Sequence, residues 1–462
     1  MTLAGIGRMA IWRDASAPAW ALAGLAMVLI LLAPALWNGF PLIFPDSGGY
    51  LARPLLGTLE LGRSAFYGAF LAAGSRLDFW PNVLAQAALV VWLMVLTLRS
   101  HRLGGRPWLA VGIVLLLALA TSLPLFAGQL MPDILFPTAV LALHLLAFRS
   151  QQLSFFERSG LGGVIVFAIA GHMATLAMAA GILASFWLLS RIRFFHLPRP
   201  RLTVAGLAVA AGIALCPVSN YAITGQFAFT PGGTSFLFAR LLEDGIVGRY
   251  LEQACPDPGL RICDYRGELT REPDDWLWKN DTPFYKLGGW QGHGEEERRI
   301  ILATIRRYPI EHLTTATVAA LQQFIAFKSE VVINPWHNAP AIGTFAELTP
   351  HLIDRLRAAR QQAQPFDTAP LNAVHVPVAA LSIAGLIGVI AFRRRLAIAP
   401  ETVALCCTVL LALAVNAAVC GIFAHPTDRY QSRLVPLAPL ALAVALFSRQ
   451  RRDRLGPAAK LA

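Results

Sequence analysis

The chain has 462 residues, of which 56% are hydrophobic and 14% are charged, and its mean hydropathy is +0.55. Soluble globular proteins carry about 25% charged residues, so this composition excludes an ordinary soluble enzyme and predicts an all-α polytopic membrane protein. The formal net charge of +12 is concentrated in short basic segments between apolar runs. That distribution is the positive-inside pattern of membrane proteins and not the footprint of a nucleic-acid-binding surface.

Apolar stretches along the chain predict about ten transmembrane helices. We expect them at about 17–37, 82–99, 107–126, 131–148, 161–174, 175–191, 202–224, 373–392, 401–424 and 431–448. Basic clusters follow every second span, which predicts that both termini lie in the cytoplasm of a bacterial-type inner membrane. The predicted organisation is a transmembrane module over 1–224, a mainly helical exterior subdomain over 225–372, and a second transmembrane module over 373–462 that ends in a basic tail.

One apolar run, over 161–191, leaves the number of passes open. Gly171 and His172 interrupt it, and each half reaches only about 23 Å at 1.5 Å per residue, short of a hydrocarbon core of about 30 Å. A single pass would place the neighbouring basic clusters on opposite sides of the membrane, so the charge pattern favours two short passes.

The polar segment 225–372 contains two cysteines, Cys255 and Cys263, that flank the turn "CPDPGLRIC". In an oxidising exterior compartment they are expected to form a local disulfide, and the alternative is two unrelated thiols. Closing so short a loop contributes roughly 2.5 kcal/mol in the chain-entropy model. Tryptophans of this segment also suit a belt at the membrane interface, namely Trp276, Trp278, Trp290 and Trp336.

Three charged segments fall on the exterior face in the predicted topology. Asp46 follows the first span in "LIFPDSGGYLARPL", Asp133 precedes the fourth in "GQLMPDILFP", and "HPTDRYQSRLVP" precedes the last. Charged groups beside hydrocarbon are costly and are usually functional. The structural alternatives are that Asp46 and Asp133 cap helices and that Arg429 and Arg433 anchor the last helix in lipid headgroups.

Arg429 and Arg433 are four residues apart, so on a helix they share a face and could hold a phosphate between two guanidinium groups. Tyr430 lies beside them, and Arg63, with Tyr67 one turn on, is a further candidate for the same phosphate. A histidine such as His172, placed mid-membrane, more often packs or hydrogen-bonds than reacts. The candidates for a substrate cavity are Tyr50, Tyr67, His172, Trp336 and His337.

Two of these motifs resemble the GT-C superfamily of integral-membrane glycosyltransferases, which use polyprenyl-phosphate sugars as donors. "FPDSGGY…GRSAFYGAF" is similar to the acid, arginine and aromatic residue of the family's first outer loop. "HPTDRYQSRLVPLAPLAL" is similar to the family's "RY…P…P" ending. The resemblance implies a GT-C-like membrane fold and a transferase of the cell envelope.

The resemblance also implies a mechanism of inverting transfer at the outer face of the membrane. Asp46 would act as general base, Asp133 would orient the acceptor or share a metal, and the arginines would bind the donor phosphate. A divalent metal stays open, because Asp46 lacks the neighbouring acid that many members carry. The implied partners are membrane lipid, the lipid-linked sugar and a glycan, lipid or protein acceptor, without nucleic acid.

Two other classes of function remain alternatives. A transporter or flippase of a lipid-linked glycan would also be polytopic and basic on the inside, but inverted repeats with matching broken helices are then expected. The chain has no such matching halves. A lipid-linked glycan ligase would likewise need basic residues on the outer face, so covalent product separates either transferase from a transporter.

Overall fold

The computed structural model describes residues 16–56, 63–192, 197–225, 227, 229, 232–329, 335, 340–363 and 367–449. In this part of the chain it is almost entirely helical, with one isolated β-bridge and no longer strand. Among the described residues, eight helical stretches are long and apolar enough to cross a membrane, which confirms an all-α polytopic membrane protein. They are α1 (Ala17–Asn38), α4 (Trp80–Ser100), Pro132–Gln152, α9 (Ala174–Arg191), α10 (Thr203–Thr224), α21 (Ala369–Ala391), α22 (Pro400–Phe423) and Asp428–Ser448.

Two of the ten expected spans are shorter helices. α5 (Pro107–Ala120) has 14 residues and α8 (Phe155–Gly171) has 17. α8 begins at a reciprocal capping box between Ser154 and Glu157, and it ends where His172 adopts an extended conformation. α9 then starts at Ala174. The interruption at Gly171 and His172 therefore separates two helices.

The membrane helices surround one central helix, α7 (Leu135–His144), in which every residue is buried. α7 belongs to the stretch Pro132–Gln152, together with the short turns η2 (Pro132–Ile134), η3 (Leu145–Arg149) and η4 (Ser150–Gln152). It packs against α4, α8, α9 and α22. A helix that is apolar on all sides must be enclosed by other helices. Asp133 lies in η2, at the start of this central element.

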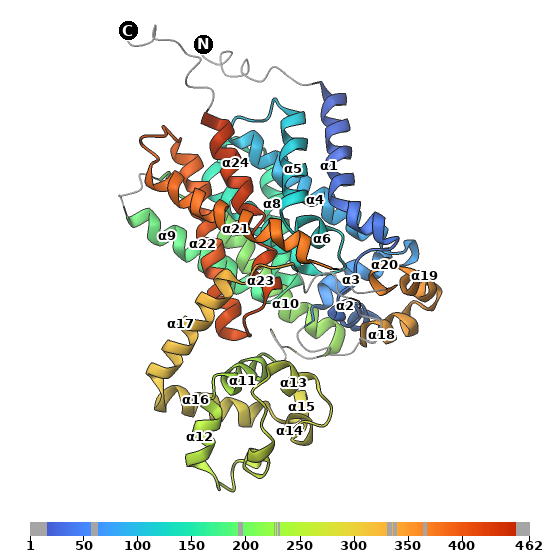
Figure 1. Cartoon of the computed structure of the whole chain (residues 1–462), viewed down its shortest axis with the longest axis vertical. Coiled ribbons are helices and arrows are strands. Elements are labelled where there is room, and N and C mark those ends of the chain that lie inside the picture. Colours follow the sequence, from blue (N-terminus) through green and yellow to red (C-terminus); the bar gives the residue numbers. More distant parts are fainter. Residues whose placement is uncertain are drawn as a thin grey trace.

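A helical lobe follows α10 and has a hydrophobic core of its own, which includes Phe238, Trp276, Phe284 and Ile300. Figure 1 shows the lobe at the opposite end of the molecule from the start of α1 and the end of α24 (Leu437–Arg449). Trp276 is fully buried in this core, so the expectation that it lies in a membrane interface belt is wrong. The lobe consists of α11 (Gly233–Glu243), α12 (Ile246–Ala254), η6 (Arg261–Glu268), α13 (Pro273–Trp278), α14 (Pro283–Lys286), α15 (Gly289–Gly292) and α16 (Gly294–Arg307).

The remainder of 225–372 packs on the membrane helices. α17 (Pro309–Ile325) leaves the lobe and runs along α22 (Figure 1). A Cβ added to Gly421 of α22 would lie 2.6 Å from the carbonyl oxygen of Ala319, so the two backbones are in close contact there. A further group of helices packs through its first member, α18 (Pro340–Leu348), against α2 (Pro45–Leu56), which carries Asp46, and through its last member, α20 (Arg360–Ala363), against α1. Between them lie η8 (Pro350–Leu352) and α19 (Ile353–Ala358).

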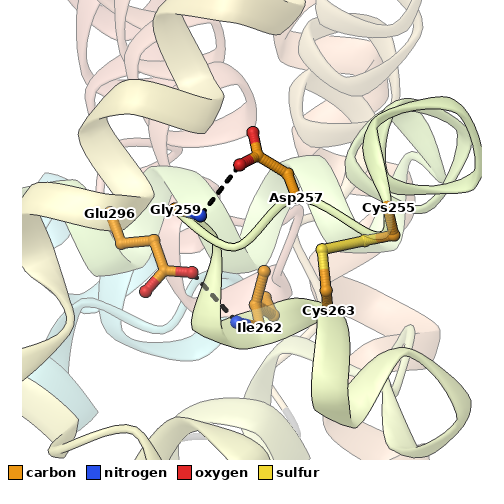
Figure 2. Close-up of a disulfide and its surroundings, with 6 residues drawn as sticks. All are labelled: Cys255, Asp257, Gly259, Ile262, Cys263 and Glu296. Atoms are coloured by element: carbon orange, nitrogen blue, oxygen red, sulfur yellow. Dashed lines mark hydrogen bonds between the residues drawn. A yellow bond between two sulfur atoms is a disulfide. The ribbon is translucent and has the colours of Figure 1, made fainter.

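Cys255 and Cys263 form a disulfide in the lobe, with their Cα atoms 5.6 Å apart. Figure 2 shows how the enclosed turn is held. The carboxylate of Asp257 accepts a hydrogen bond from the Gly259 N–H at 2.8 Å, and Glu296 of α16 accepts one from the Ile262 N–H at 2.9 Å. The disulfide loop is therefore tied to α16 as well as closed on itself.

Candidate active site

A short backbone pairing brings the two predicted acids together. The Leu42 N–H donates to the carbonyl oxygen of Gly128 at 2.9 Å, and the Leu130 N–H donates to the carbonyl oxygen of Leu42 at 2.8 Å. Asp46 lies four residues after the first of these segments, and Asp133 lies three residues after the second. The pairing therefore sets the distance between the first loop and the start of the central helix.

Two glutamine side chains hold the backbone near the charged residues of the site. The amide of Gln361 exchanges two hydrogen bonds with the backbone of Ile43, at 3.0 and 2.7 Å. The amide of Gln323 in α17 exchanges two with the backbone of Thr427, at 2.8 and 2.9 Å. A primary amide offers a donor and an acceptor side by side, as a neighbouring strand does. Each glutamine thus fixes the backbone just before a charged residue of the site.

Asp133 is the buried centre of an ion cluster. Arg429 donates to its carboxylate in bidentate fashion, with Nε–Oδ1 at 3.1 Å and Nη2–Oδ2 at 2.6 Å. Arg433 donates from Nη1 to Oδ1 at 3.0 Å. The three residues are 0%, 4% and 1% exposed. Such a buried trio requires its counter-charges, since an unpaired charge in this environment is strongly destabilising.

Asp46 is the exposed member of the same cluster, with a side chain that is 25% accessible. Its Oδ1 lies 2.5 Å from Nη2 of Arg63, and its Oδ2 lies 3.7 Å from Nη1 of Arg429. Arg429 therefore connects both carboxylates. Three guanidinium groups and two carboxylates leave one formal positive charge in the cluster, and its accessible edge is at Asp46 and Arg63.

The deep burial of the arginines is explained by aromatic rings and an amide. The guanidinium of Arg429 lies 3.9 Å from the ring centre of Phe44, and that of Arg433 lies 3.3 Å from the ring centre of Phe136. Arg433 also donates to Oδ1 of Asn416 in α22 at 3.3 Å. Cation–π contacts and the amide replace part of the hydration that these charges lose.

The predicted face shared by Arg429 and Arg433 is present in α23 (Asp428–Ser432) and the residue after it, but it points at Asp133. Because Arg433 is fully enclosed, it does not face an open phosphate position. Tyr430 is partly buried, with its ring centre 5.2 Å from the Arg433 guanidinium. Arg63, with a side chain that is 15% accessible, is the arginine of the cluster nearest to solvent, and Arg429 approaches the same edge beside Asp46.

The tyrosines assigned to a substrate cavity lie in the hydrophobic core. Tyr67 is fully buried and its hydroxyl donates to Oε1 of Gln86 at 2.7 Å. Tyr50 is 2% exposed and packs edge-on against Tyr67, with ring centres 5.2 Å apart. Gly68 permits this packing, because a Cβ there would lie 2.1 Å from the Tyr50 carbonyl oxygen. Both tyrosines position the first loop and do not line an open cavity.

His172 has a structural role at the start of α9. Its Nδ1 accepts a hydrogen bond from the Ala174 N–H at 3.2 Å, and its ring packs edge-on against Phe136 at 5.0 Å. It thereby satisfies one of the free donors at the beginning of a helix. Trp336 and His337 lie outside the described residues.

The donor set of the cluster does not fit a divalent metal. Both carboxylate oxygens of Asp133 are bound by Arg429 and Arg433, and the carboxylate of Asp46 lies between Arg63 and the same Arg429. Among the described residues, no group of three or more His, Cys, Asp or Glu side chains could hold a metal ion.

The amides that build the site, among them Gln323, Gln361 and Asn416, were not predicted from the sequence. The role of a glutamine in a polar segment cannot be predicted from the sequence when its hydrogen-bond partner is the backbone of a residue far away in the chain. Asn416 did carry one, since it is a polar residue inside the apolar span 401–424, and such residues often face other helices.

Comparison of the chain with protein-family models, with curated proteins and with solved structures found no match. Its function is therefore inferred from the chemistry of the cluster itself.

Proposed function

We propose that this protein is an integral-membrane glycosyltransferase that moves a sugar from a polyprenyl-phosphate donor to a hydroxyl group of an acceptor. The observation that carries the proposal is the position of Asp46. It is an accessible carboxylate held between Arg63 and Arg429, at the edge of a cluster with one excess positive charge. The resemblance of the surrounding motifs to the GT-C superfamily supports the class of donor.

The reaction follows from these groups. Asp46 accepts the proton of the acceptor hydroxyl while the hydroxyl oxygen forms a bond to the anomeric carbon. The bond from the anomeric carbon to the phosphate oxygen breaks, and its electron pair stays on the phosphate. Arg63 and Arg429 stabilise the charge that develops there. One displacement inverts the anomeric centre, and the products are a glycoside and polyprenyl phosphate.

The buried residues hold the reacting ones in place. Asp133 is enclosed and saturated by two guanidinium groups, so we assign it to positioning Arg429 and not to orienting the acceptor. Arg433 completes the charge balance of Asp133 in the same way. Arg429 is itself only 4% exposed, and it is grouped with the reacting residues because it lies 3.7 Å from the accessible carboxylate of Asp46.

The sidedness of the site follows from the charge pattern and the shape of the molecule. The lobe lies at the end opposite the start of α1 and the end of α24 (Figure 1). If the basic clusters mark the cytoplasm, the lobe and Asp46 face the exterior of a bacterial-type inner membrane. The lipid of the donor then lies in the bilayer with its phosphate at the outer face, beside a glycan, lipid or protein acceptor.

The test is a transfer assay with purified full-length protein in proteoliposomes. Radiolabelled polyprenyl-phosphate sugar is supplied with an extract of candidate acceptors, and labelled product is separated by chromatography. Asp46→Asn is expected to reduce transfer by at least about 100-fold, as loss of a general base does. The matched control is Asp354→Asn, which changes an exposed carboxylate of α19. Unchanged transfer in Asp46→Asn would remove Asp46 from the base role.

A further inference from the structure

We propose that three aromatic side chains of the lobe, Phe236, Trp278 and Trp290, form a platform that binds a saccharide ring of the acceptor. This aromatic platform adjoins the candidate active site, and the inference rests on the transfer reaction proposed above. It names the chemical class of the acceptor as a hydroxylated sugar ring.

The three rings contact one another, with their planes tilted by 43° to 57°. The ring centres of Phe236 and Trp290 are 5.3 Å apart, those of Trp278 and Trp290 are 5.4 Å apart, and those of Phe236 and Trp278 are 6.3 Å apart. Phe284, which is fully buried, supports Trp290 from the lobe core at 5.1 Å. Trp278 is 45% exposed. An exposed tryptophan that packs on a buried aromatic cluster is suited to binding the face of a ligand.

The platform reaches the reacting residues through one guanidinium group. Arg63 lies 5.7 Å from the ring centre of Trp278, and the same guanidinium is 2.5 Å from the carboxylate of Asp46. A ligand stacked on Trp278 would therefore present its hydroxyl groups beside the proposed general base.

Two further contacts hold the lobe against the membrane helices. Nε of Arg240 in α11 donates to the carbonyl oxygen of Gly421 at 3.2 Å. Nε2 of His425 lies 3.7 Å from Oδ1 of Asp274 in α13, the helix that ends with Trp278. These contacts come from two elements of the lobe, α11 and α13, and they add to its chain connections to α10 and α17.

The surroundings of the platform favour a sugar over a lipid headgroup. Asp274 and Asp275 lie in the first turn of α13, and the side chain of Asp274 is 72% exposed. Lys279 pairs with Asp275 at 2.6 Å, so Asp274 is the carboxylate available to repel an anionic membrane surface and to accept hydrogen bonds from hydroxyl groups. A pyranose ring matches both features, since it has an apolar C–H face for the aromatic rings and hydroxyl groups at its edge.

Binding can be measured without turnover. Full-length protein in nanodiscs is titrated with methyl hexopyranosides and short hexose oligosaccharides, and binding is followed by saturation-transfer-difference NMR. At least one of these probes is expected to bind. Trp278→Ala should lower the affinity for that probe by about tenfold through the loss of the stacking face, and Trp278→Phe should retain most of the affinity. Trp187→Ala is the matched control, because Trp187 is 53% exposed on α9.

Three results would overturn the platform. They are the absence of binding by every probe at tens of millimolar, equal affinity in Trp278→Ala, and quenching of Trp278 fluorescence by brominated lipids, which would show a lipid contact. Asp46→Asn separates this inference from the proposed function, because it should abolish transfer and leave saccharide binding unchanged. Saccharide binding that depends on Trp278, in a protein without transfer, would refute the transferase and leave the platform in place.

Discussion

Asp133 is the residue on which the buried arginines depend. Replacing it by asparagine removes the counter-charge of Arg429 and Arg433. We expect Asp133→Asn to lower the free energy of unfolding by about 3–5 kcal/mol, the cost of leaving buried charges unpaired. Thermal unfolding of the purified protein in nanodiscs measures this effect.

The matched variant for this measurement is Asp46→Asn in the same cluster. Because Asp46 is 25% accessible and pairs at the edge, its replacement should cost no more than about 1 kcal/mol. Equal unfolding temperatures for the two variants would contradict the division into a buried positioning acid and an accessible reacting acid.

His293 and Glu297 in the lobe should have opposite effects on how its stability depends on pH. Both are fully buried. Burial raises the pKa of Glu297 from 4.5 to about 7, although Ser235 donates a hydrogen bond to it, and burial lowers the pKa of His293 from 6.5 to about 4. The charged neighbours are Glu296, which acts on both residues, and Arg261, which acts on His293.

The signs of the two effects are opposite. Between pH 4.5 and 7 the folded state keeps the proton of Glu297 and the unfolded state loses it, so this residue makes stability fall as pH rises. Between pH 6.5 and 4 the unfolded state gains a proton at His293 and the folded state does not, so this residue makes stability fall as pH drops. Between pH 4.5 and 6.5 the two effects oppose each other, so the free energy of unfolding of the wild-type lobe should change little with pH.

Single substitutions should reveal each slope. In Glu297→Gln only the effect of His293 remains, so the free energy of unfolding should fall by about 3 kcal/mol as pH drops from 6.5 to 4. In His293→Gln only the effect of Glu297 remains, and a similar fall is expected as pH rises from 4.5 to 7. Hydrogen–deuterium exchange of lobe amides in the full-length protein, corrected for intrinsic rates, measures both. The same pH profile in the two variants would contradict this assignment.

At the residue scale, the sequence could predict which charges meet but not how they are buried. Asp46, Asp133 and Arg429 each lie next to an apolar span on one predicted face, and the structure brings all three into contact. Their different exposures depend on Phe44 and Phe136 and on the helices around them. That information is tertiary, so it is absent from local patterns and spacings.

At the element scale, the contact between α17 and α22 can be tested with a single methyl group. Gly421→Ala places a Cβ 2.6 Å from the backbone oxygen of Ala319, so the helices must move apart. We expect a loss of about 1–3 kcal/mol in the free energy of unfolding. The control is Gly388→Ala in α21, where a Cβ meets open space and a helix is stabilised by up to about 1 kcal/mol. Equal effects in the two variants would mean that α17 does not pack as described.

The disulfide gives a second prediction for a single element. Cys255→Ser, or mild reduction of the wild type, should destabilise the lobe by roughly 2.5 kcal/mol, because the unfolded chain regains the entropy of the loop. Exchange rates of amides in α12 and η6 report the change. The hydrogen bond from Ile262 to Glu296 should persist in part, since it does not involve sulfur. Exchange that is unaffected by reduction would contradict a stabilising role.

The long apolar helices could be predicted from the sequence, whereas the organisation of the polar segment 225–372 could be predicted only in part. Spans such as 401–424 exceed the length that a bilayer requires and coincide with helices of the structure. The segment 225–372, expected as one exterior subdomain, is divided among the lobe, α17 and the helices that cover α2. α17 exposes an apolar face suited to lipid, which includes Ile310, Leu313 and Leu321. The packed side of α17 includes the buried Ala319 and Gln323, whereas Thr314, Thr317 and Gln322 are exposed among the apolar residues.

At the scale of the whole molecule, a membrane bundle is joined to a lobe that lies beside the candidate active site. The bundle supplies Asp46, Arg63 and Arg429, and the lobe supplies the aromatic platform. A lipid-linked donor would arrive from the bilayer and an acceptor from the lobe, so the two substrates would meet at Asp46. A transporter would not require this second surface.

The most direct test of the central claim is ³¹P NMR of polyprenyl-phosphate sugar in proteoliposomes with an acceptor present. A transferase converts the phosphodiester of the donor into the phosphomonoester of polyprenyl phosphate, and the two phosphorus signals are separate. We predict that wild-type protein produces the monoester signal with time and that Asp46→Asn does not. A donor that crosses the membrane while its phosphodiester stays intact would contradict the account and identify a transporter.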